Sequence, residues 1–211
     1  MRWTDIWDAV IIGLGETGYA TASYLHSQGQ KVAITDSRAS PPLLVRLQKQ
    51  HPSIKTYLGG LSHDVLREAK KIVISPGICP KDPDIIKIVQ EYGDRIHSDI
   101  DLFLDEWPRQ VIAITGSNGK STVLKMQYDI LKHDGQSCVM IGNVGTPVLS
   151  LLEKEDKEYP AWAIIEVSSF QLHWSKKMRC DYGAIINLYP NHLDWHDDFN
   201  AYVEAKLSLL K

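Results

Sequence analysis

The sequence has only three cysteines in 211 residues, and it lacks long apolar runs and clusters of one charge. The cysteines form no C-x-x-C pair and no even framework, which indicates free thiols and no disulfide scaffold. No stretch approaches the roughly 20 apolar residues that cross a bilayer, and the N-terminus has no apolar signal core. We therefore expect a cytoplasmic protein without a membrane partner.

Neither basic nor acidic residues are in large excess. The chain has 23 basic and 26 acidic residues, and its formal net charge is −3. Because no basic run is present, we expect no nucleic-acid partner. Hydrophobic residues make up 44% of the chain, which is ordinary for a globular protein. A chain of this length forms either one large domain or two of about 100 residues each.

Apolar runs alternate with helical patterns along the chain, which predicts an α/β fold with parallel sheets. The apolar residues are contiguous, as in strands that are covered on both faces. In the first half we expect strands at 8–12, 31–35 and 71–75, and helices at 19–28 and 84–92. In the second half we expect strands at 111–115, 137–141, 162–166 and 183–187, with a helix ending near residue 133. The domain boundary is expected within 98–108, which gives domains at 1–98 and 99–211.

The most informative motif is a glycine loop that follows the strand at 111–115. It reads Thr115-Gly-Ser-Asn-Gly-Lys-Ser-Thr122, with helix-compatible residues after it. Glycines let backbone N–H groups approach phosphate oxygens, Lys120 adds a mobile charge, and the Ser121 hydroxyl can ligate Mg²⁺. The spacing fits a short G-x-x-G-K-S form, because the commonest phosphate loop has a glycine where this chain has Ile114. A plain turn explains Gly-Ser-Asn-Gly but not the Lys-Ser-Thr that follows. The motif predicts a nucleotide-triphosphate site made of Gly116, Ser117, Asn118, Gly119, Lys120, Ser121 and Thr122.

A second glycine loop, Gly13-x-Gly15-x-x-Gly18, follows the first strand, and Asp36 lies about 20 residues later. This spacing fits a dinucleotide fingerprint, although it also serves tight turns and close helix packing. Little room remains for the other half of a dinucleotide site before the second loop begins, so one nucleotide diphosphate fits better than NAD. Glu16 would repel a pyrophosphate unless it points outward, where it would complement the helix dipole.

Two further side chains are expected near the phosphate loop. Glu166 ends the strand at 162–166, where a carboxylate can reach Mg²⁺ directly or through water. The alternative is an ordinary solvated carboxylate at a strand end. His192 follows a turn at Pro190 and Asn191, so it is expected at the same sheet edge. His173 and His196 are interpreted as structural. Composition alone makes Lys206 an ordinary surface lysine on a helix.

Several motifs together resemble the Mur ligase family. They are the loop at 115–122, Glu166-Val-Ser-Ser-Phe-Gln171, Asn191-His-Leu-Asp194, Ala205-Lys206 and Gly13-Leu-Gly-Glu-Thr-Gly18. The resemblance covers the whole chain and is strongest to members that add D-glutamate to UDP-N-acetylmuramoyl-L-alanine. It implies a Rossmann-like parallel-sheet domain followed by a P-loop ATPase domain. It also implies an ATP- and Mg²⁺-dependent amide ligase of peptidoglycan precursor synthesis, working through an acyl phosphate.

The resemblance also implies a role for particular residues. For the UDP-sugar substrate these are Gly15, Glu16 and Thr17 at the diphosphate, Asp36 and Arg38 at the uracil side, Ser75, Pro76 and Gly77 in the same cleft, and Asn143 at the muramoyl-alanine part. The implied catalytic residues are Lys120 at the β- and γ-phosphates, His192 and Lys206. The implied metal ligands are Ser121 and Glu166 for one Mg²⁺, and His192 and a carbamylated Lys206 for a second. Because relatives carry an apolar residue at position 16, a side-chain role for Glu16 stays open.

Members of this family have three domains, and the resemblance implies an incomplete ATPase domain and no C-terminal amino-acid-binding domain in this chain. Closure of such a domain normally completes the site and excludes water. We therefore expect a monomer that binds UDP-type ligands but ligates poorly or not at all. A non-catalytic nucleotide-binding module and a dinucleotide-dependent oxidoreductase built on the first loop are the alternatives.

Overall fold

The computed structural model describes residues 6–143, 145–153 and 158–211. The chain divides into two compact units, Met1–Asp99 (unit 1) and Ile100–Lys211 (unit 2). Each unit has its own sheet, and every strand pair between named strands is parallel. The predicted α/β class is therefore confirmed. Within the described residues, no helix is both long and apolar enough to cross a membrane.

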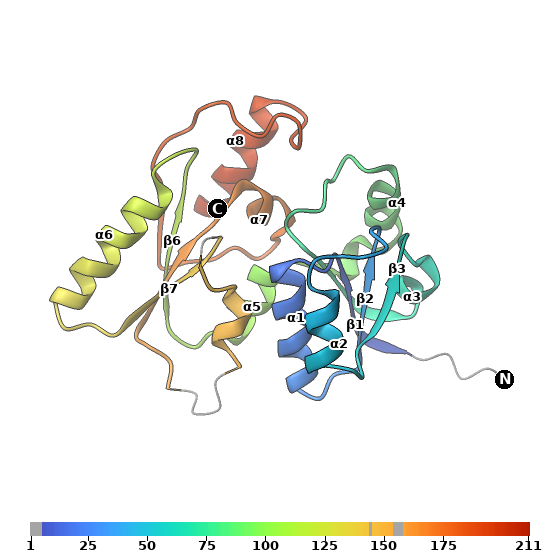
Figure 1. Cartoon of the computed structure of the whole chain (residues 1–211). Coiled ribbons are helices and arrows are strands. Elements are labelled where there is room, and N and C mark those ends of the chain that lie inside the picture. The colour runs from blue at the N-terminus through green and yellow to red at the C-terminus, as the bar shows by residue number, and fades with distance from the viewer. Residues whose placement is uncertain (1–5, 144, 154–157) are drawn as a thin grey trace. The chain divides into compact units, whose positions relative to one another are not determined.

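Unit 1 is a five-stranded sheet in the order β3-β2-β1-β4-β5, with helices on its two faces (Figure 1). The central strand β1 carries Val10, Ile11 and Ile12, which are all fully buried. Burial on both faces explains the contiguous apolar run in the sequence. The elements of this unit are β1 (Trp7–Ile12), α1 (Glu16–Ser27), β2 (Val32–Asp36), α2 (Leu44–Gln50), β3 (Lys55–Leu58), α3 (His63–Arg67), β4 (Ala69–Ile74), α4 (Pro83–Tyr92), η1 (Gly93–Arg95) and β5 (Ile96–His97).

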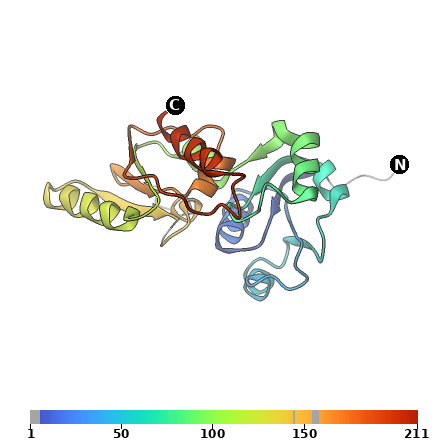
Figure 2. The ribbon, with the colours of Figure 1, turned by 90° about the horizontal axis from the view of Figure 1, so that it is seen from above.

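Unit 2 is a four-stranded sheet in the order β7-β8-β6-β9. Helix α6 and helix α8 lie on opposite sides of these strands, as Figure 2 shows. The elements are α5 (Asp99–Glu106), which starts at the unit boundary, β6 (Gln110–Thr115), α6 (Lys120–His133), β7 (Cys138–Gly142), η2 (Val148–Leu151), β8 (Trp162–Glu166), α7 (Ser169–Trp174), β9 (Tyr182–Ile185), α8 (Phe199–Leu207) and η3 (Ser208–Leu210). Both β6 and β8 are interior strands, so Thr115 and Glu166 reach the same sheet edge.

The structure adds strands β3 and β5 and helices α2 and α3 to the sequence-based elements of unit 1, and it moves the start of α1. In unit 2, β9 ends at Ile185, two residues before the predicted end. Strands β3 and β5 were not predicted, so the strand expected third along the chain is the fourth, β4. Helix α1 begins at Glu16, three residues before the predicted start. Its N-cap is Gly15, and no side chain caps it. The first turn of α1 therefore belongs to the glycine loop itself.

Candidate functional site

The phosphate loop joins β6 to α6 in the middle of unit 2. A Cβ at Gly116 would lie 2.5 Å from Cγ1 of Ile186, so only glycine fits there. Gly119 is the N-cap of α6 in a left-handed conformation (φ +79°), and no side chain caps the helix. The first N–H groups of a helix have no intrahelical partners. In α6 they are available to an anion, which the helix dipole also favours.

The side chain of Lys120 folds back over this loop. Its Nζ donates to the carbonyl oxygens of Gly116 at 2.9 Å and of Ser117 at 3.2 Å. The ammonium charge is thus held beside the loop amides and not out in solvent. A phosphate that binds the loop meets both the N–H groups and this positive charge.

Glu166 ends β8 beside the loop, and its carboxylate is almost fully buried (1% exposed). Ser121 Oγ donates to Oε2 at 2.7 Å, and Asn143 Nδ2 donates to Oε1 at 3.0 Å. A carboxylate oxygen and a hydroxyl oxygen therefore lie together at the start of α6. Hard oxygen donors of this kind fit Mg²⁺, which usually takes only one or two protein ligands beside phosphate and water. No cluster of three or more His, Cys, Asp or Glu side chains suited to a metal occurs among the described residues.

Lys206 is not the surface lysine that composition predicts, because it is only 2% exposed. Helix α8 directs its Nζ to Thr115 Oγ1 and to the Gly116 carbonyl, at 3.0 Å each. Burial and, second to it, the charge of Lys120 lower the pKa of Lys206 to about 8, and Glu166 partly opposes both. An ammonium group has no lone pair to give a metal. Unmodified Lys206 therefore does not fit a metal site, whereas a carbamate on the same nitrogen would.

His192 lies in the connection between β9 and α8, with a left-handed backbone (φ +54°). It opens onto a cavity of about 200 Å³ together with Lys120, Lys206 and Asn143. The ring of Phe170 lies 4.8 Å from that of His192. The further residues that line this cavity are Gly116, Ser117, Ser168, Ser169, Asn191 and Tyr202. Six of the site residues named from the sequence thus line one cavity: Gly116, Ser117, Lys120, Asn143, His192 and Lys206.

The motif Ser-Ser-Phe-Gln fixes the wall of this cavity through a capping box on α7. Ser168 Oγ accepts from the Gln171 amide at 3.1 Å, and Gln171 Oε1 accepts from the Ser168 amide at 3.1 Å. The box starts the helix so that Phe170 faces the cavity. A helix start that satisfies two backbone donors in this way is well defined in position.

His173 and His196 belong to an aromatic cluster with Phe170 and Trp195. His196 is 2% exposed, and its Nε2 lies 3.0 Å from Ser169 Oγ. The ring of His173 packs against Trp195, and burial lowers the pKa of this histidine. Both histidine side chains are thus packed within this cluster.

In unit 1 the first glycine loop is closed by backbone contacts and by Asp36. Gly18 packs directly on the carbonyl of Gly13, where a Cβ would overlap it, and Ser75 Oγ donates to the same carbonyl at 2.9 Å. The Asp36 carboxylate accepts from the Leu14 amide at 2.7 Å and from both the amide and the guanidinium of Arg38. Because these donors take up its oxygens, Asp36 is poorly placed to bind a ribose hydroxyl.

The charge of Asp36 is stabilised by the same contacts. Burial alone would raise the pKa of this carboxyl, but the hydrogen bonds from Arg38 and from the Leu14 amide outweigh it and lower the pKa. The Arg38 side chain stays half exposed. It is therefore Arg38 that faces solvent beside the loop.

Apart from Asn143, which lies in unit 2, the remaining residues predicted for the UDP substrate lie at the same edge of the unit 1 sheet. Glu16 is exposed in the first turn of α1, next to Gly15 and Thr17. Ser75, Pro76 and Gly77 follow β4, the strand that pairs with β1. The structure thus collects them at one sheet edge, which is where such sheets bind ligands.

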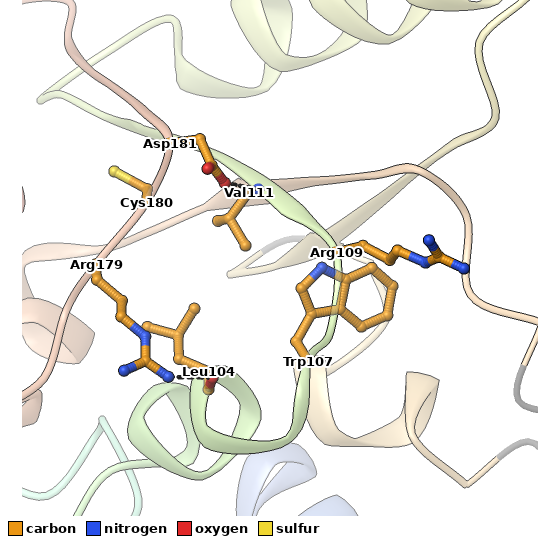
Figure 3. Close-up of a pocket in the computed structure, with 7 residues that line it drawn as sticks. All are labelled: Leu104, Trp107, Arg109, Val111, Arg179, Cys180 and Asp181. Carbon is orange, nitrogen blue, oxygen red and sulfur yellow. Dashed lines mark hydrogen bonds between the residues drawn. The ribbon is translucent and has the colours of Figure 1, made fainter.

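Unit 2 has another cavity, of about 230 Å³, near the opposite end of β6 (Figure 3). Two of its charged side chains are already hydrogen-bonded. Asp181 Oδ2 accepts from the Val111 amide at 2.7 Å, and Arg179 donates to the Leu104 carbonyl at 2.8 Å. The Arg109 side chain points away from Arg179, with Trp107 between them (Figure 3). The two arginine side chains of this cavity therefore do not converge on a position where they could bind an anion together.

The fold and these contacts define an α/β protein of two parallel sheets, with a glycine loop of the phosphate-loop type in its second unit. Comparison with family models identifies residues 7–97 as a Mur ligase MurD-like N-terminal domain and residues 114–211 as a Mur ligase middle domain. The chain belongs to the Mur ligase family.

Curated relatives agree with that assignment. The chain is 39% identical over 203 residues to a UDP-N-acetylmuramoylalanine--D-glutamate ligase of Nitrosococcus oceani, covering 96% of this chain and 44% of that protein. It is 38% identical over 197 residues to the enzyme of the same name from Marinobacter nauticus, covering 93% of this chain and 43% of that protein. The chain thus spans less than half the length of these relatives.

A solved structure supports the fold. The UDP-N-acetylmuramate:L-alanyl-gamma-D-glutamyl-meso-diaminopimelate ligase from Neisseria meningitides matches with a TM-score of 0.59 at 19% identity. The match covers 97% of this chain and 67% of that structure.

Proposed function

We propose that this chain provides the UDP-substrate and ATP sites of a ligase that joins D-glutamate to UDP-N-acetylmuramoyl-L-alanine. The observation that supports the proposal best is the cavity of unit 2, where Lys120, His192 and Lys206 meet. The identity of 38–39% to proteins named as D-glutamate ligases supports this choice of substrates.

In the proposed reaction, a carboxylate oxygen of UDP-N-acetylmuramoyl-L-alanine attacks the γ-phosphorus of ATP. The bond from the γ-phosphorus to the bridging oxygen breaks, and ADP leaves. The amine of D-glutamate then attacks the acyl carbon, an amide forms, and inorganic phosphate and a proton are released. Charge on the transferred phosphoryl group spreads over its oxygens, so catalysis consists mainly of positioning and electrostatic stabilisation.

The residues of the phosphate loop serve the first of these steps. The free N–H groups at the start of α6 bind the phosphate oxygens, and Lys120 neutralises the charge on the β- and γ-phosphates. Ser121 and Glu166 would hold a Mg²⁺ ion, which supplies further neutralisation of the phosphate oxygens. Because the Glu166 carboxylate is already held by Asn143, it is pre-positioned for this ligand.

We assign Lys206 a second role, as a carbamylated ligand with His192 for another Mg²⁺. Carbamylation needs the neutral amine, which attacks CO₂ and loses a proton as the N–C bond forms. The lowered pKa of Lys206, about 8, makes more of the neutral amine available than on an ordinary lysine. The product is an anion with oxygen donors, which suits Mg²⁺.

In unit 1, we propose that the glycine loop binds the diphosphate of the UDP substrate. Gly15 and Thr17 contribute backbone N–H groups at the start of α1, and Arg38 contributes positive charge. Glu16 is exposed, and its negative charge interacts favourably with the positive end of the α1 dipole, without direct contact with the ligand. We assign Ser75, Pro76 and Gly77 to the same ligand, and Asn143 in unit 2 to its muramoyl-alanine part.

A second candidate function is binding of the nucleotide and the UDP-sugar without ligation. It rests on the two glycine loops, each of which leads into a helix whose N-terminus has no side-chain cap and can accept a phosphate. A dinucleotide-dependent oxidoreductase has less support, because the oxygens of Asp36 are taken up by the loop and by Arg38.

Calorimetric titration with UDP-N-acetylmuramoyl-L-alanine, combined with a phosphate-release assay containing ATP, Mg²⁺ and D-glutamate, tests these candidates. Binding with phosphate release and formation of the D-glutamyl product supports the ligase. Binding of both ligands without phosphate release supports the binding function for this chain. Absence of binding, or a fluorescence change on titration with NADH, contradicts the proposal.

A further inference from the structure

Asn187 lies directly under the phosphate loop, two residues beyond the end of β9. Its Oδ1 accepts hydrogen bonds from the backbone amides of Ser117 and Asn118, at 3.0 Å each. Its Nδ2 donates to the carbonyl of Asn118 at 2.9 Å. One side-chain amide therefore satisfies three backbone groups of a loop that has no regular partner strand.

The backbone around Asn187 holds the loop from the same side. The Asn187 carbonyl also accepts from the Ser117 amide at 3.2 Å, and the Ile186 amide donates to the Thr115 carbonyl at 3.0 Å. The Ile186 side chain fills the space where Gly116 has no Cβ. The segment after β9 thus forms the floor of the loop, and Asn187 provides its polar contacts.

Ser117 connects this floor to α8 through its hydroxyl. Its Oγ lies 2.6 Å from the Tyr202 hydroxyl and accepts from the Tyr189 amide at 2.8 Å. Tyr202 is almost fully buried. Asn187 thus binds the amide of Ser117, and Tyr202 binds its hydroxyl. These hydrogen bonds hold the first half of the loop in place.

We propose that Asn187 is a positioning residue that holds the phosphate loop in its anion-accepting conformation before a ligand arrives. This inference rests on the proposed ATP site. Fixing the Ser117–Asn118 backbone aims the N–H groups at the start of α6 and the Lys120 ammonium at one point. Because the loop is ordered in advance, phosphate binding does not have to meet the entropy cost of ordering it.

The test compares Asn187→Ala with the unsubstituted 211-residue chain in calorimetric titrations with ATP·Mg²⁺ and with inorganic tripolyphosphate. Both titrations are run well below the melting temperature of each protein. We expect the Kd of both anions to rise at least about tenfold, because the loop must then be ordered on binding. Amide hydrogen exchange at Ser117 and Asn118 is expected to accelerate, since both amides lose their acceptor.

The matched control is Asn200→Ala, which removes the same side chain from an exposed position on α8. It should leave anion affinity and loop exchange unchanged. If Asn187→Ala does not fold, Asn187→Asp keeps the acceptor oxygen for both amides but loses the donor to the Asn118 carbonyl. A rise in Kd is then expected, whereas amide exchange at Ser117 and Asn118 should change little. Anion affinity equal to that of the unsubstituted chain, in a folded variant at position 187, would contradict the inference alone. Absence of ATP binding by the unsubstituted chain would contradict the proposed function, and the inference with it.

Discussion

At the scale of single residues, Glu166 shows how hydrogen-bond donors compensate a buried negative charge in the proposed ATP site. A buried carboxylate is costly unless donors or cations compensate it. Here Ser121 and Asn143 each donate one hydrogen bond to it. Those two contacts leave the carboxylate at the start of α6, where a metal held with phosphate would complete the compensation.

Glu166→Gln tests this role because it removes the charge and retains the size. We expect the affinity for ATP in the presence of Mg²⁺ to fall at least about tenfold, since a neutral amide is a poor ligand for Mg²⁺. Affinity for ATP in EDTA should change little. Calorimetry with and without Mg²⁺ measures both values, and Glu204→Gln, on an exposed part of α8, is the control. Equal losses with and without the metal would argue against a metal ligand.

In contrast to Glu166, the unmodified ammonium group of Lys206 is buried beside a charge of its own sign, that of Lys120. Its pKa falls from 10.5 in a free side chain to about 8 in the fold. The unfolded chain therefore binds more protons between pH 8 and 10.5, so this group makes stability rise with pH in that window. Below about pH 8 the penalty for holding the buried charge is fully present.

Lys206→Met should accordingly stabilise the chain at pH 7 in buffer free of carbon dioxide, by on the order of 2 kcal/mol. The stabilisation should shrink as the pH approaches 10, where the lysine is neutral in the fold. Urea denaturation at the two pH values measures the difference, with the exposed Lys132→Met as control. A difference that is constant or grows with pH would refute the account of the lowered pKa.

At the scale of elements, the phosphate loop depends on the contact between the end of β6 and the segment after β9. The two strands pair in parallel up to Thr115 and Ile185. Beyond that pair, Ile186 packs where Gly116 has no side chain. The glycine is therefore required by its neighbour, in addition to any requirement from phosphate.

Gly116→Ala should destabilise the chain by about 1–3 kcal/mol and weaken ATP binding, since the new methyl group collides with Ile186. Ile186→Ala removes the colliding atoms, so the double variant should recover much of the ATP affinity lost by Gly116→Ala. Thermal denaturation and ATP titration of the two single variants and the double variant measure the coupling. Strictly additive losses would show that the glycine is required for another reason.

Elements with strong apolar runs could be predicted from the sequence, and those without them could not. Strand β8, at Trp162–Glu166, has the predicted bounds because its central residues are apolar and buried on both faces. Strand β3 is a partly exposed edge strand that includes Lys55 and Thr56, and β5 has only two residues. Neither produces a recognisable pattern.

Within the candidate site, the glycine loop and Glu166 could be predicted because the loop follows a strand of clear pattern and Glu166 ends one. The burial of Lys206 could not, since the residues around it on α8 show no consistent apolar stripe. Asn187 was missed for a related reason. An amide after a strand is typical of any loop, and only the three-dimensional contacts with Ser117 and Asn118 reveal what it does.

At the scale of the whole molecule, the chain combines two sheets, each with a glycine loop after one of its interior strands. The loops differ in chemistry. That of unit 1 is closed by Asp36 and presents Arg38, whereas that of unit 2 holds Lys120 and lies beside Glu166. The account assigns the UDP part of one substrate to the first loop and ATP to the second.

The most direct test of this assignment is a calorimetric comparison of the unsubstituted chain with Lys120→Ala, titrated with ATP·Mg²⁺ and with UDP. The account predicts that Lys120→Ala weakens ATP binding at least about tenfold, because a charge-assisted contact to the phosphates is lost. UDP binding should be unchanged, since its loop belongs to the other sheet. ATP binding that survives the substitution intact, or that is absent from the unsubstituted chain, would contradict the central claim.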